Sequence, residues 1–434
     1  MRHIMALTIT ISALTCIAMI CAVLFFPKIK IGKLSFGSYW AVTLIGAGLL
    51  LLTGSVDLST VGGALFANTA INPLKILVLF ISMTVLSIFL DELGFFRYLA
   101  SATLKKAGAS QLKLFLLLYV TVSVLTVFTS NDIIILSFTP FICYFAKNAK
   151  ISPMPYLAAE FVAANTWSMA LIIGNPTNIY LVTAAGGDFV SHLKVMLLPT
   201  LASGAVACAL LFLIFKNKLG EPISAEPEAV ELTDKVQLTV GIVHLAVCTV
   251  VLAIGSYIGI EMWLVSLISA LSLFLCTTVI SAARKKKPSA LISCLKRAPW
   301  ELIPFIISMF VMVEALRANG VTDAIFSLLG ERAQVWTYGI TSFLAANLVN
   351  NIPMSVLYSS ILASGGSVAA VYATVVGSNL GACLTPIGAL AGIMWSSILK
   401  EHGLKFGYLD FLKIGVSVAI PALAAALLTL GFVI

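Results

Sequence analysis

Two short polar stretches, Thr129-Ser130-Asn131-Asp132 and Asn350-Asn351-Ile352-Pro353, each interrupt a hydrophobic run that is long enough to cross a bilayer. A second break follows each of them, at Gly174-Asn175-Pro176-Thr177-Asn178 and at Thr385-Pro386-Ile387-Gly388. Breaks in membrane helices expose backbone groups that lipid cannot satisfy, so they persist only inside protein or beside a water-filled cavity. Paired breaks in two halves of a chain are typical of secondary transporters that bind solute near the membrane midplane.

The composition places the chain in a membrane. Hydrophobic residues make up 60% of the 434 residues, charged residues only 10%, and the mean hydropathy is +1.07, which is far from the range of soluble domains. We interpret the first apolar run, 6–26, as a retained span rather than a cleaved signal, because it is long and basic residues follow it. The other runs near the spanning length are 37–56, 73–90, 194–215, 237–258, 262–283, 300–318 and 414–433. We therefore predict an all-α, multi-pass protein of the cell membrane.

The distribution of Lys and Arg predicts the orientation. Basic residues concentrate in alternate loops, which are 27–36, 92–113, 147–150, 216–236, 284–297 and 400–413. Cytoplasmic loops are enriched in Lys and Arg, so these loops are expected inside the cell and both termini outside. The net charge of +8 then reports membrane topology and does not indicate a nucleic-acid partner.

Equivalent segments of the two halves have opposite orientation in this scheme. Segment 91–113 precedes the first polar stretch and lies inside, whereas 317–332 precedes the second and lies outside. This pattern predicts two inverted-topology repeats with broken transmembrane helices. We expect a first half at 1–215, a flexible cytosolic linker at 216–236 and a second half at 237–434.

The tract 110–148 fits either two full spans or a re-entrant hairpin, because both begin and end on the same side. We favour the hairpin, since its polar turn between Phe128 and Ile133 is poorly suited to water. Segments 93–106 and 288–298 mix apolar and basic residues at near-helical spacing and are predicted to lie in the membrane interface.

Neutral polar side chains gather at the breaks. A helix that ends in mid-membrane offers amide groups to an anion, and unwound carbonyls offer oxygen ligands to a small cation. The residues expected to bind substrate or coupling ion are Ser130, Asn131, Asp132, Gly174, Asn175, Thr177, Asn178, Asn350, Asn351, Ser378, Asn379, Thr385 and Gly388. Among them Asn131 and Asn351 are the candidate sodium ligands.

Four prolines are predicted to keep helices from closing over the breaks, namely Pro140, Pro176, Pro353 and Pro386. In the alternative interpretation the polar residues only join helices by hydrogen bonds and the prolines only kink them. The symmetric arrangement of four breaks favours a binding site.

Asp132 is the only carboxylate inside any of the four breaks, and we expect it to be a coupling-ion ligand or a proton carrier. Glu160 and Glu314 lie in apolar stretches, and Glu314 can pair with Arg317 at helical spacing. Asp91 and Glu92, which follow the third span, are expected at the interface.

At these residues the chain resembles the ion transporter superfamily, most closely the arsenical pump membrane protein (arsenite efflux) family. The similar stretches are 91–96, 130–132 with Thr139-Pro140, 297–300, 350–353, 377–381 and 385–390. The chain departs from the arsenite pumps at Asn165 and Asn379, which stand in place of carboxylates, and at Cys383, in place of a lysine. Residues 174–178 instead resemble the sodium-coupled dicarboxylate and citrate branches. The resemblance implies two re-entrant hairpins, an elevator type of alternating access and a homodimer.

These patterns predict a secondary transporter of a small oxyanion or oxyacid, with arsenite or antimonite efflux first among the candidates. The alternatives are a sodium/proton antiporter, which needs Asp132 but no polyatomic substrate, and a sodium-coupled transporter of di- or tricarboxylates. A channel is disfavoured, because it needs a continuous pore and no paired breaks. We expect no enzyme activity and no cofactor, with a proton or sodium gradient as the driving force. The chain contains no phosphate-binding G-x-x-x-x-G-K-[ST] loop, so ATP dependence would require a separate ATPase subunit.

Overall fold

The computed structural model describes residues 2–26, 28–31, 34–67, 72–223, 230, 232 and 234–434, and nearly all of them are helical. The predicted all-α membrane fold is confirmed, with one small addition. Strands β1 (Lys28–Ile31) and β2 (Leu34–Gly37) form an antiparallel hairpin between the first two helices. Alternation of Ile and Lys in this segment suits a strand with two different faces.

The first half of the chain runs from α1 to α10. Its helices are α1 (Arg2–Phe25), α2 (Ser38–Leu52), α3 (Leu58–Phe66), α4 (Pro73–Glu92), α5 (Phe95–Ala107), α6 (Gln111–Phe128), α7 (Asn131–Asn148), α8 (Met154–Trp167), the short η1 (Ile172–Gly174), α9 (Pro176–Ala184) and α10 (Phe189–Phe215). The single turn η2 (Lys216–Lys218) follows α10.

The second half repeats this order of elements. Its helices are α11 (Lys235–Ile258), α12 (Met262–Ala283), α13 (Ser289–Arg297), α14 (Leu302–Ala318), α15 (Val321–Leu329), α16 (Gln334–Val349), α17 (Asn351–Ala363), α18 (Val368–Gly381), the short η3 (Pro386–Gly388), α19 (Leu390–Glu401) and α20 (Tyr408–Val433). In each half a hairpin of two helices precedes a helix that is interrupted by one short turn.

Eight of the described helices are long and apolar enough to cross a membrane. Seven of them coincide with predicted spans. The predicted span 37–56 is shorter than expected, because α2 ends at Leu52. The additional long helix is α6, which lies inside the broken tract 110–148.

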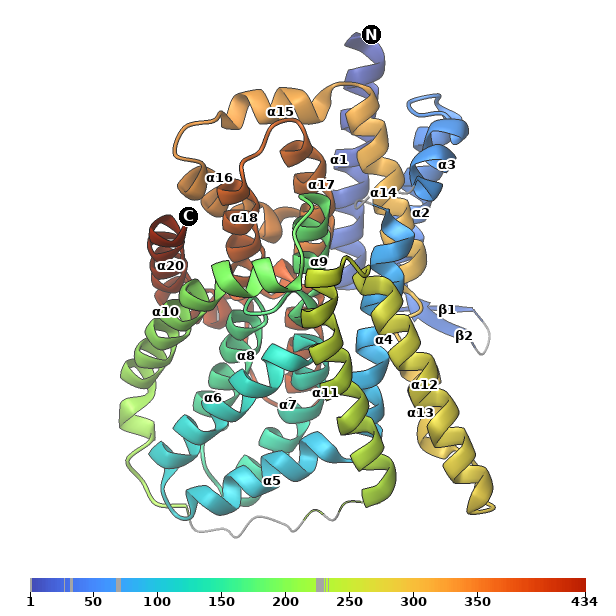
Figure 1. The fold of residues 1–434 in the computed structure, drawn as a ribbon. Helices are drawn as coiled ribbons and strands as arrows, with labels where there is room; N and C mark the ends of the chain where they lie inside the picture. Colours follow the sequence, from blue (N-terminus) through green and yellow to red (C-terminus); the bar gives the residue numbers. More distant parts are fainter. Residues whose placement is uncertain are drawn as a thin grey trace.

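The two hairpins enter the molecule from opposite ends (Figure 1). The α6–α7 hairpin occupies the lower part of the view and the α16–α17 hairpin the upper part, and both turns point toward the middle. Both turns are also buried, as Ser130, Asn131, Asn350 and Asn351 show. The turn of tract 110–148 is therefore inside the protein, as the predicted re-entrant hairpin requires.

A short helix leads into each hairpin, α5 at the bottom and α15 at the top of Figure 1. Each begins after a glycine in the left-handed conformation, Gly94 with φ 81° and Gly320 with φ 71°. A side chain in this conformation is disfavoured, so glycine suits the sharp change of direction. Helix α5 confirms the amphipathic helix predicted at 93–106, and α13 the one at 288–298.

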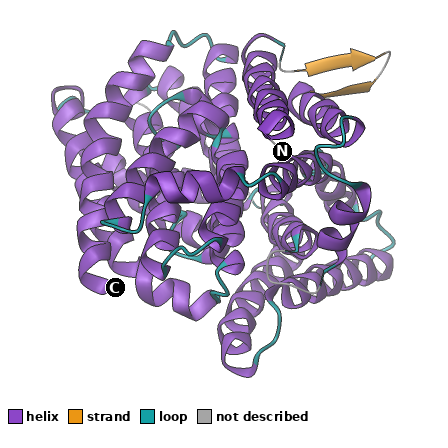
Figure 2. Ribbon diagram, turned by 90° about the horizontal axis from the view of Figure 1, so that it is seen from above, coloured by secondary structure: helices purple, strands orange, loops and turns teal. Residues whose placement is uncertain are grey.

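The long helices form two sets (Figure 2). In the view from above, a broad set that carries the C-terminus lies beside a second set that carries the N-terminus and the β-hairpin. Helices α6–α10 pack with α16–α20, and we call these the hairpin set. Helices α1, α2, α4 and α11–α14 pack with one another and form the scaffold set. Helix α5 packs on α4 of the scaffold set and on α6 and α7 of the hairpin set, and α15 packs on α14 and α17, so both lie between the sets.

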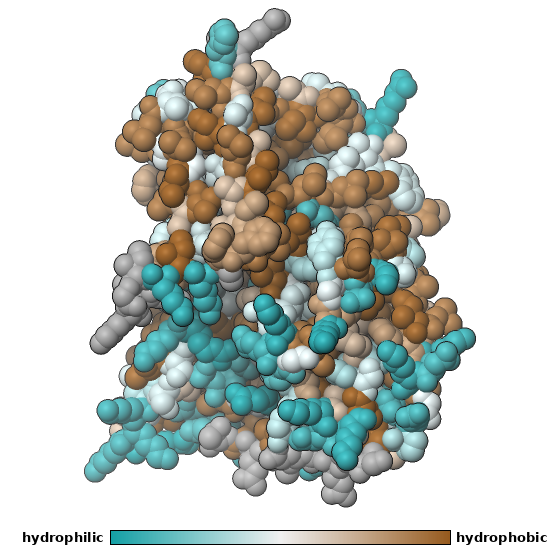
Figure 3. Space-filling view, turned by 180° about the vertical axis from the view of Figure 1, so that it is seen from behind, coloured by the Kyte–Doolittle hydropathy of each residue, from teal (hydrophilic) through white to brown (hydrophobic). Residues whose placement is uncertain are grey.

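The predicted linker 216–236 is only partly described, because 224–229, 231 and 233 lie outside the described residues. Its beginning is held in place: the backbone N–H of Ile223 donates to the carbonyl of Ala109 at 2.7 Å. This part of the segment is therefore docked on the α5–α6 turn and is not a free tether. Figure 3 shows hydrophilic side chains over the lower part of one face and hydrophobic ones over the upper part.

Candidate functional site: two hairpin turns around a buried asparagine network

The turn of the first hairpin leaves one amide oxygen without a partner. Asn165 donates from Nδ2 to the Phe161 carbonyl at 2.9 Å, which directs its Oδ1 toward Asn131. Asn131 must therefore donate, and its Nδ2 lies 3.1 Å from Asn165 Oδ1. The remaining Oδ1 of Asn131 and the neighbouring Ser130 Oγ are buried and have no hydrogen-bond partner among the residues that the structure describes. Orphaned buried oxygens are rare in proteins and indicate a missing partner.

The break between α8 and α9 is closed by side chains of the first half. Asn178 Nδ2 donates to two carbonyls that the interrupted helix leaves free, Ser168 O at 2.8 Å and Leu171 O at 3.1 Å. Asn175 caps α9 by accepting from the Thr177 N–H at 3.1 Å. Gly174 lies against Ser168, where an added Cβ would come within 2.3 Å of the carbonyl oxygen. Only glycine fits there without moving the backbone.

Asn379 of α18 joins the two halves. Its Oδ1 accepts from Ser168 Oγ at 2.9 Å and from Asn175 Nδ2 at 3.0 Å. Its Nδ2 donates to Asn178 Oδ1 at 2.7 Å and to the Val375 carbonyl at 2.8 Å. The asparagine therefore uses its full hydrogen-bonding capacity in a fully buried position.

In the turn of the second hairpin, the side chain of Asn350 has partners within the protein. Asn350, at φ 75°, donates from Nδ2 to the Ile387 carbonyl at 3.2 Å and accepts from the Ile352 N–H at 3.3 Å. Asn347 of α16 donates to the Gly381 carbonyl at 3.0 Å and accepts from Thr385 Oγ1 at 2.5 Å. This half therefore closes its own break with the Asn347 amide.

The other predicted second-half residues lie around this turn. Ser378 Oγ lies 3.3 Å from Ser355 Oγ, and Asn351 is buried at the start of α17. An added Cβ at Gly388 would come within 2.6 Å of the Gly381 carbonyl oxygen. This close approach mirrors that of Gly174 in the first half.

Three of the four predicted helix-breaking prolines lie at breaks. Pro176 is the first residue of α9, Pro353 is in the first turn of α17, and Pro386 begins η3. The prediction for Pro140 is wrong, because α7 continues through it to Asn148. Its missing N–H removes the partner of the Leu136 carbonyl, and both residues line a cavity where water can replace that partner.

The carboxylates differ in their surroundings. Asp132 is half-buried in the first turn of α7, and the described residues supply no hydrogen bond or ion pair to its side chain. Glu160 is fully buried and accepts from Thr139 Oγ1 at 2.9 Å and Trp395 Nε1 at 3.3 Å. Glu314 pairs with Arg317 at 3.0 Å, as predicted. Asp132 is thus the carboxylate of the hairpin turns that is free to take a ligand.

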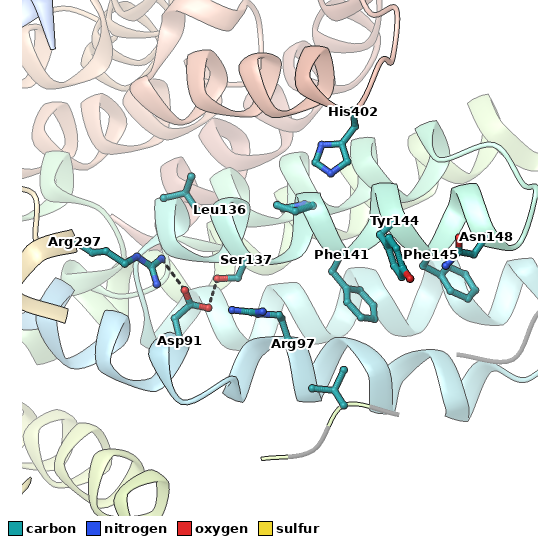
Figure 4. Close-up of a pocket in the computed structure, with 12 residues that line it drawn as sticks. Asp91, Arg97, Leu136, Ser137, Phe141, Tyr144, Phe145, Asn148, Arg297 and His402 are labelled. Carbon is teal, nitrogen blue, oxygen red and sulfur yellow. Dashed lines mark hydrogen bonds and ion pairs between the residues drawn. The ribbon is translucent and has the colours of Figure 1, made fainter. Parts of the chain in front are cut away.

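A cavity of about 930 Å³ opens beside α7 (Figure 4). At one end Asp91 is held from both sides: Ser137 Oγ donates to Oδ1 at 2.6 Å, and an Arg297 amino group lies 2.7 Å from Oδ2. Arg97 also lines the cavity, as does His402. Ser137 lies six residues from Asn131, or roughly 9 Å along the helix axis. The cavity therefore ends within a few turns of the first hairpin turn.

Asp91, predicted with Glu92 to lie at the membrane interface, is only 4% exposed and so lies inside the protein. Arg297 bridges it to Glu92, which lies 2.5 Å from the other amino group. Ser137 belongs to the hairpin set, and Asp91 and Arg297 to the scaffold set, so this contact joins the two sets. This contact could not be predicted, because no local pattern in the sequence relates residues 91, 137 and 297.

Comparisons with known proteins agree with this architecture. A family described as CitMHS, citrate transporter, matches residues 37–370. The chain is 27% identical over 421 residues to an arsenical pump membrane protein of Escherichia coli (strain K12), covering 91% of this chain and 93% of the relative. It is 25% identical over 380 residues to a 46 kDa membrane protein of Mycobacterium leprae, covering 81% and 84%.

Among solved structures, the chain is similar to the Alcanivorax borkumensis YdaH transporter, whose crystal structure was described as revealing an unusual topology. The TM-score is 0.57 with 14% identity, and the match covers 99% of this chain and 98% of that one. At this identity the likeness supports the fold alone.

Proposed function

This chain belongs to the citrate transporter family, and from that premise we propose that it exports a small oxyacid, arsenite or antimonite, in exchange for a coupling ion. The family and relatives along most of the chain support a multi-pass membrane transporter of the ion-coupled, anion-transporting class. The proposed substrate comes from the similarity to an arsenical pump membrane protein, which covers 91% of the chain at 27% identity.

One observation carries the transport proposal. Two hairpin turns that enter from opposite ends meet a buried network in which Asn379 of one half bonds to Asn175 and Asn178 of the other. The network holds the break closed, and beside it Ser130 Oγ and Asn131 Oδ1, which have no partner among the described residues, offer neutral polar oxygens in the interior, where a solute that has left water needs them. The adjacent Asp132 adds one carboxylate, which can bind a cation or carry a proton.

The two helix sets support an elevator type of cycle. Helices α5 and α15 lie between the sets and begin at the left-handed glycines Gly94 and Gly320. A hinge is a short segment that absorbs a change in backbone angles, and glycine allows such a change at low cost. We propose that the hairpin set moves against the scaffold set at these two points, with a proton or sodium gradient as the driving force.

The test is arsenite flux into everted membrane vesicles under an imposed proton gradient, with sodium present or absent. Gradient-dependent accumulation above that of vesicles without the protein is the expected result. Folded protein that moves no arsenite under either gradient would contradict the oxyacid proposal.

The cavity favours a second candidate, sodium-coupled transport of a di- or tricarboxylate. Arg97 lines the cavity from α5, and a guanidinium matches the planar geometry of a carboxylate. The test variant is Arg97→Gln and the control is Lys106→Gln. Lys106 lies nine residues after Arg97 in α5, and therefore on the opposite face of that helix. If citrate is a substrate, only Arg97→Gln should raise its KM. Equal KM values in both variants would remove this argument.

A further inference from the structure

We infer that the hydrogen bond between Ser137 and Asp91 holds the hairpin set in the observed position against the scaffold set, and that this bond breaks whenever the hairpin set moves. The inference rests on the movement proposed above and names the contact that controls it. It follows from where the polar bonds of the molecule lie.

Polar bonds tie each set together internally. All ion pairs between described residues lie within the scaffold set and its turns, for example that of Lys75 with Glu261. The asparagine network lies within the hairpin set, where Asn379 joins α18 to the break between α8 and α9. Each set is therefore built to move as one body.

The surfaces between the sets are different in character. Helix α4 of the scaffold set packs on α7 and α9, and α14 packs on α17. The buried side chains of α4 between Ile76 and Leu90 are mostly apolar. Among the hydrogen bonds between described residues, one joins the two sets, from Ser137 Oγ in α7 to Asp91 Oδ1 in α4 at 2.6 Å.

This difference separates sliding from holding. Apolar burial has no preferred direction, so two packed helical surfaces can shift past one another at small cost. A hydrogen bond is short and directional, so it specifies one position. The Ser137–Asp91 bond is thus the polar contact that selects the observed arrangement of the two sets.

Ser137 can leave Asp91 without losing a hydrogen bond. Its hydroxyl has one proton but two acceptors within reach, Asp91 Oδ1 at 2.6 Å and the Ile133 carbonyl of its own helix at 2.8 Å. When the sets separate, the hydroxyl can turn fully to Ile133. The hairpin set then carries no unpaired donor, which in the interior would be costly.

Asp91 is also supported when Ser137 leaves. Its Oδ2 keeps the Arg297 amino group at 2.7 Å, because both residues belong to the scaffold set. Its Oδ1 borders the cavity of about 930 Å³, where water can replace the hydroxyl. Figure 4 shows the Arg97 side chain pointing toward Asp91 and Ser137 from α5, the helix between the sets. The bond can therefore break and form again in every cycle.

The experiment measures the distance between the two sets by double electron–electron resonance on the full-length protein in lipid nanodiscs. Spin-labelled p-acetylphenylalanine replaces Lys147 in the last turn of α7 and Lys287 after α12, so the eight native cysteines stay in place. In Ser137→Ala, the population at the distance of the unmodified protein should fall, relative to other distances, by about two- to tenfold. This is the factor that one net hydrogen bond supplies.

Two further variants separate the contact from a general effect of losing a hydroxyl. Ser123 in α6 is also buried, and its hydroxyl donates to the Tyr119 carbonyl of its own helix at 2.7 Å. Ser123→Ala is the matched control and should leave the distances unchanged. Ser137→Thr keeps the hydroxyl and should restore most of the original population. Gel filtration establishes that each variant is folded.

Unchanged populations in Ser137→Ala, or an equal shift in Ser123→Ala, would overturn the inference. Movement that occurs but does not respond to Ser137→Ala removes this contact and leaves the proposed cycle. A single distance in every variant, with and without arsenite, removes the proposed movement as well. The substrate is tested separately, since a shift in Ser137→Ala without arsenite flux in vesicles keeps the contact and removes arsenite.

Discussion

Asn165 and Asn379 hold the same place in the two halves but point to different partners. Both donate to the carbonyl one turn earlier. The Oδ1 of Asn165 then accepts from Asn131 within its own half, whereas Asn379 bonds to Ser168, Asn175 and Asn178 of the other half. One asparagine orients a hairpin turn and the other joins the halves.

This difference predicts unequal effects of two matched substitutions. Asn379→Asp loses both donated hydrogen bonds and turns a carboxylate oxygen toward Asn178 Oδ1, at a cost of about 1–3 kcal/mol for each unmet buried group. Asn165→Asp keeps its acceptor for Asn131 and loses one donated bond only. Thermal unfolding in detergent should therefore show the larger drop in Tm for Asn379→Asp. Equal drops would mean that Asn379 does not hold the halves together.

Asp132→Asn should abolish gradient-driven transport and leave the protein folded. The Asp132 side chain has no hydrogen bond or ion pair among the described residues, so its neutral isostere changes stability by less than ~1 kcal/mol. Vesicle flux under an imposed gradient measures the first effect and Tm the second. Normal gradient-driven flux in this variant would exclude Asp132 from the coupling mechanism.

Removal of Arg297 should destabilise the protein more than removal of Arg284. Arg297→Ala leaves the buried carboxylate of Asp91 with only Ser137, and loss of a buried ion partner costs roughly 3–5 kcal/mol, less here because Arg297 is itself 39% exposed. Arg284→Ala breaks a pair with Asp234 in which both side chains are partly exposed, worth about 0–1 kcal/mol. Chemical or thermal unfolding of the two variants provides the comparison, and a similar loss in both would show that the Asp91 contact stabilises the protein no more than an exposed ion pair does.

The glycines at the start of α5 and α15 should resist replacement for backbone reasons alone. A Cβ at Gly94 or Gly320 would touch nothing within 4 Å, so the expected cost of roughly 1–2 kcal/mol for alanine comes from the left-handed conformation. Gly48, inside α2 and equally open, is the control, and alanine there should be neutral or stabilising by up to ~1 kcal/mol.

If these glycines are hinges, Gly94→Ala and Gly320→Ala should also slow vesicle transport at a temperature where both variants remain folded, so that lost stability does not explain the lower rate. Unchanged turnover in both would place the movement elsewhere.

Several features could be predicted from the sequence because they depend on neighbouring residues. Hydrophobic length located seven of the eight long helices, and polar residues within apolar runs located the breaks. The pairing of Glu314 with Arg317 follows from helical spacing and is confirmed. Charge in the loops predicted that α5 and α15 lie at opposite ends, as they do in Figure 1.

The tertiary structure decided what the polar residues do. Asn347 is unremarkable in the sequence, since an asparagine near the end of a helix is common, yet its position beside Gly381 makes it the group that closes the second break. The sequence predicts a helix break at Pro140, but packing and the adjacent cavity allow α7 to continue through this residue.

By itself, then, the sequence determined a membrane protein of two inverted halves with broken helices, because burial in lipid imposes a hydrophobic length and a penalty on every exposed backbone group that can be recognised locally. Only the tertiary structure decided that Asn379 bonds across the halves, that Ser137 contacts Asp91, and that Asn131 Oδ1 has no partner in the described part of the chain. Hydrogen bonds are short and directional, so their partners depend on how distant helices pack, and no local pattern in the chain records that packing.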